Sequence, residues 1–204
     1  MERNIVIRLA TREDVSAMVS IHLAGFPGFF LTFLGPRFLN VLYENILAIE
    51  ENISLVAVND NQQIEGFVVG SLSAEGLYKK LLVNSWFDFA MASVVPAIRN
   101  PASIPRLLRA LRASPNGRKS SADCLLMSIA VSPNTHGAGS GRMLIEEFLD
   151  ISVQRGAQGV ILTTDKENNE RVNRFYNSIG FELYQSFVTP EGRQMNEYIY
   201  NLAD

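Results

Sequence analysis

The chain has 204 residues, of which 47% are hydrophobic and 19% charged, and its mean hydropathy is +0.08. These values are typical of a globular domain with a sizeable core, and they exclude a disordered or low-complexity protein. One cysteine and two histidines exclude a disulfide framework and a metal centre built from several such ligands, and the net charge of −3 argues against a nucleic-acid binder. We expect a cytoplasmic protein without stable membrane insertion, because no apolar segment resembles a signal peptide or a spanning helix.

The apolar pattern along the chain predicts an α/β domain. The predicted strands cover residues 5–9, 54–59, 64–72, 124–131, 159–164, 181–188 and 195–201. Between them we expect helices that begin at Val15, behind a Thr11–Asp14 capping box, and after Gly35-Pro36, and further helices over 143–153 and 170–178. This order predicts a mixed sheet, partly antiparallel and partly parallel, that is flanked by helices.

Residues 75–120 are predicted to form a basic helical insert between the third and fourth strands of a single domain, 1–204. The insert holds eight basic and two acidic residues, whereas the rest of the chain holds ten basic and nineteen acidic ones. Four interpretations stay open: a solvated face, a lid over a substrate pocket, a homodimer surface, or a contact with an acidic partner or a membrane surface.

A glycine-rich turn follows the strand predicted at 124–131 and leads into a helix. Gly137, Gly139 and Gly141 have no Cβ, so a ligand can approach the backbone, and the amides at the start of a helix attract phosphate. Arg142 stands where a P-loop requires lysine and where a dinucleotide-binding loop requires its third glycine. Both of those nucleotide-binding patterns therefore fit poorly.

Two motifs resemble those of the GNAT-type N-acetyltransferases. The first, His136-x-x-Gly139-x-Gly141, has the spacing of the family's Gln/Arg-x-x-Gly-x-Gly/Ala loop, with histidine in the first position. The second, Asn169-x-x-Val172-x-x-Phe175-Tyr176-x-x-x-Gly180-Phe181, resembles the family's Asn-x-x-Ala-x-x-hydrophobic-Tyr-x-x-x-Gly-Phe segment, with valine in place of alanine. With 75–120 treated as an insertion, the resemblance covers nearly the whole chain.

The resemblance implies transfer of an acetyl group from acetyl-coenzyme A (acetyl-CoA) to a primary amine of a small molecule. Tyr176 would be the general acid that protonates the leaving thiolate, and a backbone amide of the strand near 129–131 would stabilise the oxyanion. The residues that the resemblance implies in binding acetyl-CoA are Ile129, Ala130, Val131, His136, Gly137, Ala138, Gly139, Ser140, Gly141, Arg142 and Asn169. No metal is implied.

The acceptor side is less defined by the sequence. His22 and Phe29 are candidate substrate residues, because the first helices flank the acceptor site in this family, although His22 also fits a histidine of the apolar core. The run Gly25–Phe30 resembles acetyltransferases of polysaccharide pathways, so an amino sugar is a candidate acceptor beside antibiotics, polyamines and protein N-termini. No spacing selects the general base among its candidates, His22, Glu65, Asp123 and Ser128.

A second class of function stays open beside the enzyme. The glycine-rich turn also fits a structural turn, and Tyr176 also fits a core aromatic residue. The histidine at position 136 and the lack of an obvious base also leave open a non-catalytic module on the same fold, which binds acyl-CoA or uses the insert as an interaction surface.

Overall fold

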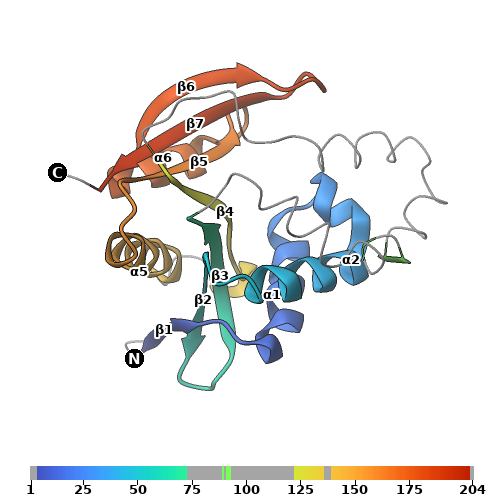
Figure 1. The fold of residues 1–204 in the computed structure, drawn as a ribbon. Coiled ribbons are helices and arrows are strands. Elements are labelled where there is room, and N and C mark those ends of the chain that lie inside the picture. The colour runs from blue at the N-terminus through green and yellow to red at the C-terminus, as the bar shows by residue number, and fades with distance from the viewer. Residues whose placement is uncertain (1–3, 73–88, 90, 93–121, 136–138, 203–204) are drawn as a thin grey trace.

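Seven strands form one sheet in the order β1-β2-β3-β4-β5-β7-β6 (Figure 1). A computed structural model describes residues 4–72, 89, 91–92, 122–135 and 139–202. The strands are β1 Ile5–Leu9, β2 Asn52–Asn59, β3 Ile64–Ser71, β4 Cys124–Val131, β5 Gly159–Asp165, β6 Glu182–Val188 and β7 Gln194–Asn201. β4 and β5 are parallel and all other neighbours are antiparallel, so the predicted mixed sheet is confirmed.

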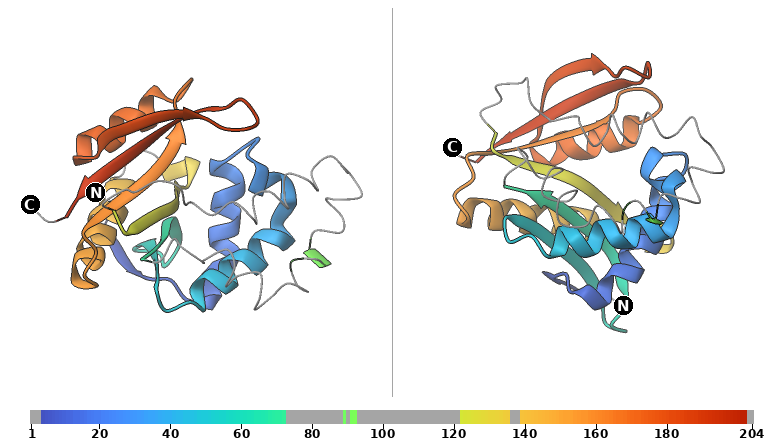
Figure 2. Two further views of the ribbon diagram at one scale, coloured as in Figure 1. Left: turned by 45° about the horizontal axis from the view of Figure 1, so that its top comes forward. Right: turned by 45° about the vertical axis from the view of Figure 1, so that its right-hand side comes forward.

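In the described part of the chain, four longer helices cover the two faces of this sheet. α1 Val15–Gly25 and α2 Phe30–Leu47 lie on one face, and α5 Ser140–Gln154 and α6 Glu170–Ile179 lie on the other (Figures 1 and 2). Short 3₁₀ turns, η1 Arg12–Asp14 and η2 Pro133–Thr135, precede α1 and follow β4. The alternating side chains of the central strands therefore face two different helix pairs.

Each face of the sheet has its own apolar core. The α1–α2 core contains Met18, Leu39, Tyr43, Phe67 and Val69 among its buried residues. The α5–α6 core contains Val68, Leu144, Phe148, Tyr176 and Phe181. Phe67 and Val69 face one core and Val68 faces the other, as the two-residue period of a strand requires.

The capping box predicted before α1 is present. The Thr11 backbone N–H donates to Asp14 Oδ2 over 2.7 Å, and Arg8 Nη1 pairs with the same oxygen at 2.6 Å. The Arg8 side chain is also the main cause that lowers the pKa of Asp14, ahead of the Thr11 bonds. These contacts join β1 to the start of α1.

The second helix begins earlier than the sequence suggests. Gly35-Pro36 was expected to precede it, yet α2 starts at Phe30 and passes through a kink in which Gly35 has a φ of +83°. The Phe33 amide donates to the Phe29 carbonyl over 3.0 Å, so a first helical turn already forms before the kink. Glycine is the residue that tolerates this left-handed conformation, and it lets the two helical pieces join.

The predicted insert, 75–120, lies mostly outside the described residues. Phe89, Met91 and Ala92 are helical, and Phe89 is buried in the α1–α2 core. Its ring centroid lies 5.2 Å from that of Phe38 on α2. This part of the insert therefore packs against the helix pair that covers the first face.

Candidate active site

β4 and β5 separate soon after they begin. Their register contains only the pairs Cys124↔Val160 and Leu125↔Ile161. Because parallel strands run in the same direction, the carboxyl ends at Val131 and Asp165 form the open end of this pair. Among the described strands, the edge of β4 that faces β5 has no partner beyond Leu125, so its backbone groups there are available to a ligand.

A β-bulge shapes β4 where the two strands separate. Gly70 pairs with Leu126 and Val69 with Ser128, so Met127 is the extra residue. Met127 packs against the α1–α2 core, and the Ser128 side chain interacts with the Tyr43 hydroxyl and lowers the Tyr43 pKa, against the larger rise caused by burial. The bulge thus turns two consecutive side chains toward one face, which is a common device beside active sites.

Beyond the bulge, the predicted acetyl-CoA residues of β4 alternate between the two cores. Ile129 and Val131 pack against the α5–α6 core, whereas Ala130 is buried in the α1–α2 core. A Cβ on Gly25 would lie only 3.2 Å from the Ala130 Cβ, so the last residue of α1 is in close contact with β4. These three residues supply backbone to the open edge, and α1 ends beside it.

The start of α5 carries backbone amides that have no hydrogen-bond partner among the described residues. Gly139, with a φ of +84°, precedes the helix, and the Met143 amide donates to its carbonyl over 3.1 Å. The amides of Ser140, Gly141 and Arg142 come before that bond, and a helix offers such amides no internal partner. They point out of a positive helix end, which favours an anion. His136, Gly137 and Ala138 lie outside the described residues.

The Ser140 hydroxyl is a second unusual feature of this helix start. Ser140 is only 1% exposed, and its Oγ has no hydrogen-bond partner among the described residues. A buried hydroxyl without a partner costs free energy, so a ligand that bonds to it would recover that cost. The described residues of the loop therefore fit a phosphate group.

The Arg142 side chain bonds to other residues of the chain on the protein surface. Its Nη2 donates to the carbonyl and hydroxyl of Ser178 on α6, over 3.2 and 3.1 Å, and its Nη1 pairs with Glu146 at 3.4 Å. Any contact of Arg142 with acetyl-CoA in this conformation would use its backbone amide, because the guanidinium links α5 to α6.

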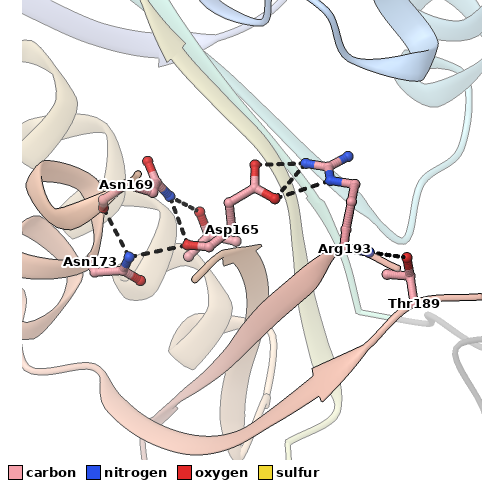
Figure 3. Close-up of polar contacts among 6 residues, drawn as sticks. Asp165, Asn169, Asn173, Thr189 and Arg193 are labelled. Atoms are coloured by element: carbon pink, nitrogen blue, oxygen red, sulfur yellow. Dashed lines mark hydrogen bonds and ion pairs between the residues drawn. The ribbon is translucent and has the colours of Figure 1, made fainter. Parts of the chain in front are cut away.

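Asn169 and Asn173 hold the end of β5 against α6 (Figure 3). Asn169 Nδ2 donates to Thr164 Oγ1 over 2.7 Å and to the Asp165 carbonyl over 3.1 Å. Asn173 Nδ2 donates to the same carbonyl over 3.1 Å, and its Oδ1 accepts the Tyr198 hydroxyl over 3.0 Å. The Asn169 amide nitrogen is thus occupied, and its Oδ1 is the side-chain atom left for the predicted contact with acetyl-CoA.

Tyr176 is part of the α5–α6 core. It is 6% exposed, and its ring centroid lies 5.6 Å from that of Phe175, 5.7 Å from that of Phe181 and 6.0 Å from that of Tyr198. Burial raises the pKa of its hydroxyl above the ordinary value of 10.0. The hydroxyl therefore stays protonated at neutral pH, as a proton donor must, although the same burial is expected of a core residue.

His22 is buried between α1 and α2. It is 3% exposed, its Nδ1 lies 2.7 Å from the Tyr43 hydroxyl, and its Nε2 is buried without a described partner. Burial lowers the pKa of His22 to about 4, so the ring is neutral at pH 7. The Tyr43 hydroxyl thus contacts His22 and interacts with Ser128 beside the bulge, a proximity of two candidate bases that the sequence analysis did not predict.

The other two candidate bases have different surroundings. The Glu65 carboxylate is buried and accepts Asn59 Nδ2 over 3.0 Å through Oε1, while Oε2 has no described partner. Asp123 Oδ1 accepts the backbone amides of Gln158 and Gly159 over 2.9 and 3.4 Å. Asp123 therefore caps the paired end of β4 and β5, away from their open end.

Phe29 contacts a residue that the sequence analysis missed. The Arg193 Cζ lies 4.8 Å from the centroid of the Phe29 ring. Arg193 Nη2 also lies 2.6 Å from both carboxylate oxygens of Asp165 (Figure 3). The β6–β7 turn thereby meets both the α1–α2 connection and the open end of β5. No motif or spacing marks Arg193, because only the tertiary fold brings these three segments together.

Two further observations concern metals and membranes. Within the described ranges, no three His, Cys, Asp or Glu side chains are grouped as metal ligands would be. No described helix is both long and apolar enough to cross a membrane.

Comparisons with known proteins agree with this architecture. A sequence model of the acetyltransferase (GNAT) family matches residues 17–181. The chain belongs to the GNAT family of acetyltransferases. Its sequence matches no curated protein significantly.

Solved structures show the GNAT fold in more detail. A protein from Desulfovibrio desulfuricans, assigned to the GNAT family, is 15% identical with a TM-score of 0.64, and the match covers 98% of this chain and 100% of that one. The ribosomal-protein-S18-alanine N-acetyltransferase of Escherichia coli is 14% identical with a TM-score of 0.59, over 98% and 96% of the two chains. The yncA protein of Salmonella typhimurium, assigned as an acetyltransferase and solved with acetyl-CoA, is 16% identical with a TM-score of 0.60, over 98% and 95%. These likenesses confirm the predicted GNAT fold.

Proposed function

We propose that this chain transfers the acetyl group of acetyl-CoA to a primary amine of a small molecule. The observation that carries the proposal is the separation of β4 from β5 beyond two paired positions, beside amides at the start of α5 that lack a described partner. An open strand edge and a positive helix end are the two features that an acyl-CoA needs. Its arm carries amides that pair with backbone, and its pyrophosphate is an anion.

The described residues divide the binding of acetyl-CoA between them. The β4 edge at Ile129–Val131 would pair with the amides of the pantetheine arm. The amides of Ser140, Gly141 and Arg142, together with the unpartnered Ser140 hydroxyl, would hold the pyrophosphate. Asn169 Oδ1 would accept from the arm where β5 ends.

The proposed reaction forms a bond from the amine nitrogen to the acetyl carbon and breaks the carbon–sulfur bond. A backbone amide of the β4 edge would stabilise the oxyanion, and Tyr176 would give its proton to the leaving thiolate. The amine must also lose a proton. Among the candidate bases, Ser128 lies on the bulge beside the opening, and Tyr43 connects it to the neutral His22.

A non-catalytic acyl-CoA-binding module is the second candidate function. The packing of Tyr176 among Phe175, Phe181 and Tyr198 favours it, because a core aromatic residue has the same neighbours. This module would bind acetyl-CoA without releasing a thiol from it.

The test is an assay of thiol release from acetyl-CoA with a panel of amines, measured together with calorimetric titration of acetyl-CoA. The panel contains amino sugars, polyamines, aminoglycosides, amino acids and peptides with free N-termini. We expect amine-dependent thiol release with at least one class. Binding without release for every amine would favour the module instead, and absence of binding would contradict both functions.

A further inference from the structure

We propose that the Arg193 guanidinium recognises a negatively charged group, a carboxylate or a phosphate, on the amine that this chain acetylates. The inference rests on the proposed function and names the class of its acceptor. It is carried by the contacts that hold Arg193, by the donors that those contacts leave free, and by the place of Arg193 in the fold.

Arg193 is held on several sides. Its Nε and Nη2 donate to Asp165 Oδ1 over 3.1 and 2.6 Å, and Nη2 also lies 2.6 Å from Oδ2. The Phe29 ring packs against the guanidinium with 4.8 Å between the ring centroid and Cζ. The Arg193 amide donates to Thr189 Oγ1 over 3.3 Å, which fixes the turn itself. A guanidinium that is already fixed loses little conformational freedom when it binds an anion.

The same contacts leave one nitrogen of the guanidinium, Nη1, open. An arginine has five N–H donors in a planar fork, and Asp165 uses the edge formed by Nε and Nη2. Nη1 has no hydrogen-bond partner among the described residues, and the side chain is 36% exposed. The two Nη1 hydrogens are therefore the donors left for a carboxylate or phosphate oxygen.

Arg193 is bonded to the open end of β5, beside which the proposed reaction takes place. Asp165 is the last residue of β5, at the end where β5 has separated from β4. The Asp165 carbonyl accepts a hydrogen bond from Asn173 Nδ2, and Asn173 Oδ1 accepts one from the Tyr198 hydroxyl. The Tyr198 ring centroid lies 6.0 Å from that of Tyr176. An acceptor whose amine approaches the open edge of β4 would therefore have its other end toward the β6–β7 turn.

A structural clamp is the alternative role for these contacts. The ion pair and the ring contact would then only join the β6–β7 turn to the α1–α2 connection. A partly buried ion pair of this geometry stabilises the turn in either role, so stability alone does not distinguish the two. The two roles predict different kinetics, because a clamp affects all acceptors equally.

The experiment measures kcat and KM for matched amines by thiol release at saturating acetyl-CoA. Glycine with glycinamide tests the carboxylate, and phosphoethanolamine with ethanolamine tests the phosphate. Each pair is assayed with the wild type, with Arg193→Gln and with Arg12→Gln. Arg12 is an exposed arginine paired to Glu44 at 3.0 Å, so its substitution removes the same charge and a comparable ion pair elsewhere. Because each variant is compared with the wild type on the same amine, the difference in pKa between the two amines of a pair does not affect the result.

We expect kcat/KM of the wild type to be higher for the anionic member of at least one pair. Arg193→Gln should lower that value by about tenfold or more, mainly through KM, as loss of a charge-assisted hydrogen bond predicts. The neutral member should change by less than about threefold, and Arg12→Gln should resemble the wild type in both. The pair of amines that responds identifies the recognised group as a carboxylate or a phosphate.

Three results would overturn the inference. One is an equal loss for both members of a pair in Arg193→Gln, which is the signature of a clamp. Another is a panel in which no anionic amine is a better acceptor than its neutral partner, although acetyl-CoA binds in a calorimetric titration. Failure of the wild type to bind acetyl-CoA at all would instead refute the proposed function, and the inference with it.

Discussion

His22 shows how far burial can lower the pKa of one side chain. A free histidine is about half protonated at pH 6.5, whereas His22, enclosed by α1 and α2, has a pKa of about 4. Desolvation is the cause, because moving a charge out of water disfavours the protonated ring. The ring is therefore neutral in the folded chain over the whole range in which an unfolded histidine takes up its proton.

This shift predicts a loss of stability in acid. Between pH 6.5 and 4 the unfolded chain binds the His22 proton and the folded chain does not, so stability is complete above 6.5 and falls as the pH decreases. Between pH 7.5 and pH 5, the free energy of unfolding measured in urea should decrease for the wild type. This decrease should be about 2 kcal/mol larger than the one measured for His22→Gln.

Tyr43→Phe is the matched control for this pH effect. It removes the 2.7 Å contact to His22 Nδ1 but leaves the ring buried, so it should keep the pH dependence of the wild type. A His22→Gln variant with the same pH dependence as the wild type would show that His22 is not the group responsible.

The proposed function makes Tyr176 the proton donor to the leaving thiolate. Replacement by phenylalanine removes the donor and retains the ring that packs on Phe181 and Tyr198. We expect Tyr176→Phe to lower kcat by about 10²-fold or more, the usual contribution of a general acid, with little change in the KM for acetyl-CoA.

Tyr184→Phe provides the comparison for that variant. Tyr184 lies on β6 and is 49% exposed, so the same chemical change is made outside the proposed site. Wild-type turnover is expected from Tyr184→Phe. If Tyr176→Phe also retained full turnover, the hydroxyl would have no catalytic role and Tyr176 would be a core residue.

At the scale of elements, Gly70 on β3 allows α5 to approach the sheet. A Cβ at Gly70 would lie 2.4 Å from Phe148 Cζ and 2.6 Å from the Leu125 carbonyl oxygen. One of these atoms is backbone and the other belongs to a fully buried ring, so neither can move cheaply. Gly70→Ala is expected to lower the free energy of unfolding by about 1–3 kcal/mol or more, as overpacked cores do, in urea denaturation.

Gly141→Ala is the control for Gly70→Ala. Its Cβ would lie 3.4 Å from Val131 and 3.5 Å from Phe175, which are ordinary contacts. Since alanine is the better helix former, stability should be unchanged or raised by up to about 1 kcal/mol. Equal stabilities for the two variants would show that the spacing between β3 and α5 is looser than these distances indicate.

Most elements could be predicted because each one has a local signal. The strands Ile5–Leu9 and Cys124–Val131 were predicted with their observed bounds, from apolar runs bounded by turn residues. The start of α2 was wrong by several residues. Gly35-Pro36 signals a break, and the backbone bond from the Phe33 amide to the Phe29 carbonyl, 3.0 Å, shows that a helical turn precedes it.

The candidate site was only partly predictable for a related reason. Tyr176 and Asn169 could be identified because their spacing along the chain resembles a family motif. Tyr43 and Arg193 could not, since each contacts residues that are distant in the sequence: Tyr43 meets His22 and Ser128, and Arg193 meets Phe29 and Asp165. No local pattern carries such contacts.

At the scale of the whole molecule, the order of the strands decides where a ligand can bind. β7 pairs with β5 and separates it from β6, although the hairpin of β6 and β7 comes last in the chain. The other edge of β5 faces β4, where pairing stops after two positions. Hydrophobic periodicity predicts the strands but not this order, because every strand of a central sheet has a similar pattern.

The partners and location of the protein stay predictions from composition. We expect no metal, no nucleic-acid partner and no stable membrane insertion, and a cytoplasmic location. A homodimer formed through the basic segment at 75–120 is one of its open interpretations, and sedimentation at several salt concentrations would reveal a dimer held together by charge.

Thermal unfolding with acetyl-CoA, coenzyme A, NAD and ATP tests most directly whether the open end of β4 and β5 binds acyl-CoA. A ligand present at about 100 times its dissociation constant adds roughly 2.7 kcal/mol of stability, which raises the melting temperature by a few degrees. We predict this rise with acetyl-CoA and with coenzyme A, and none with NAD or ATP. A melting temperature unchanged by both coenzyme A species, or raised by NAD alone, would contradict the binding site and the acetyltransferase function built on it.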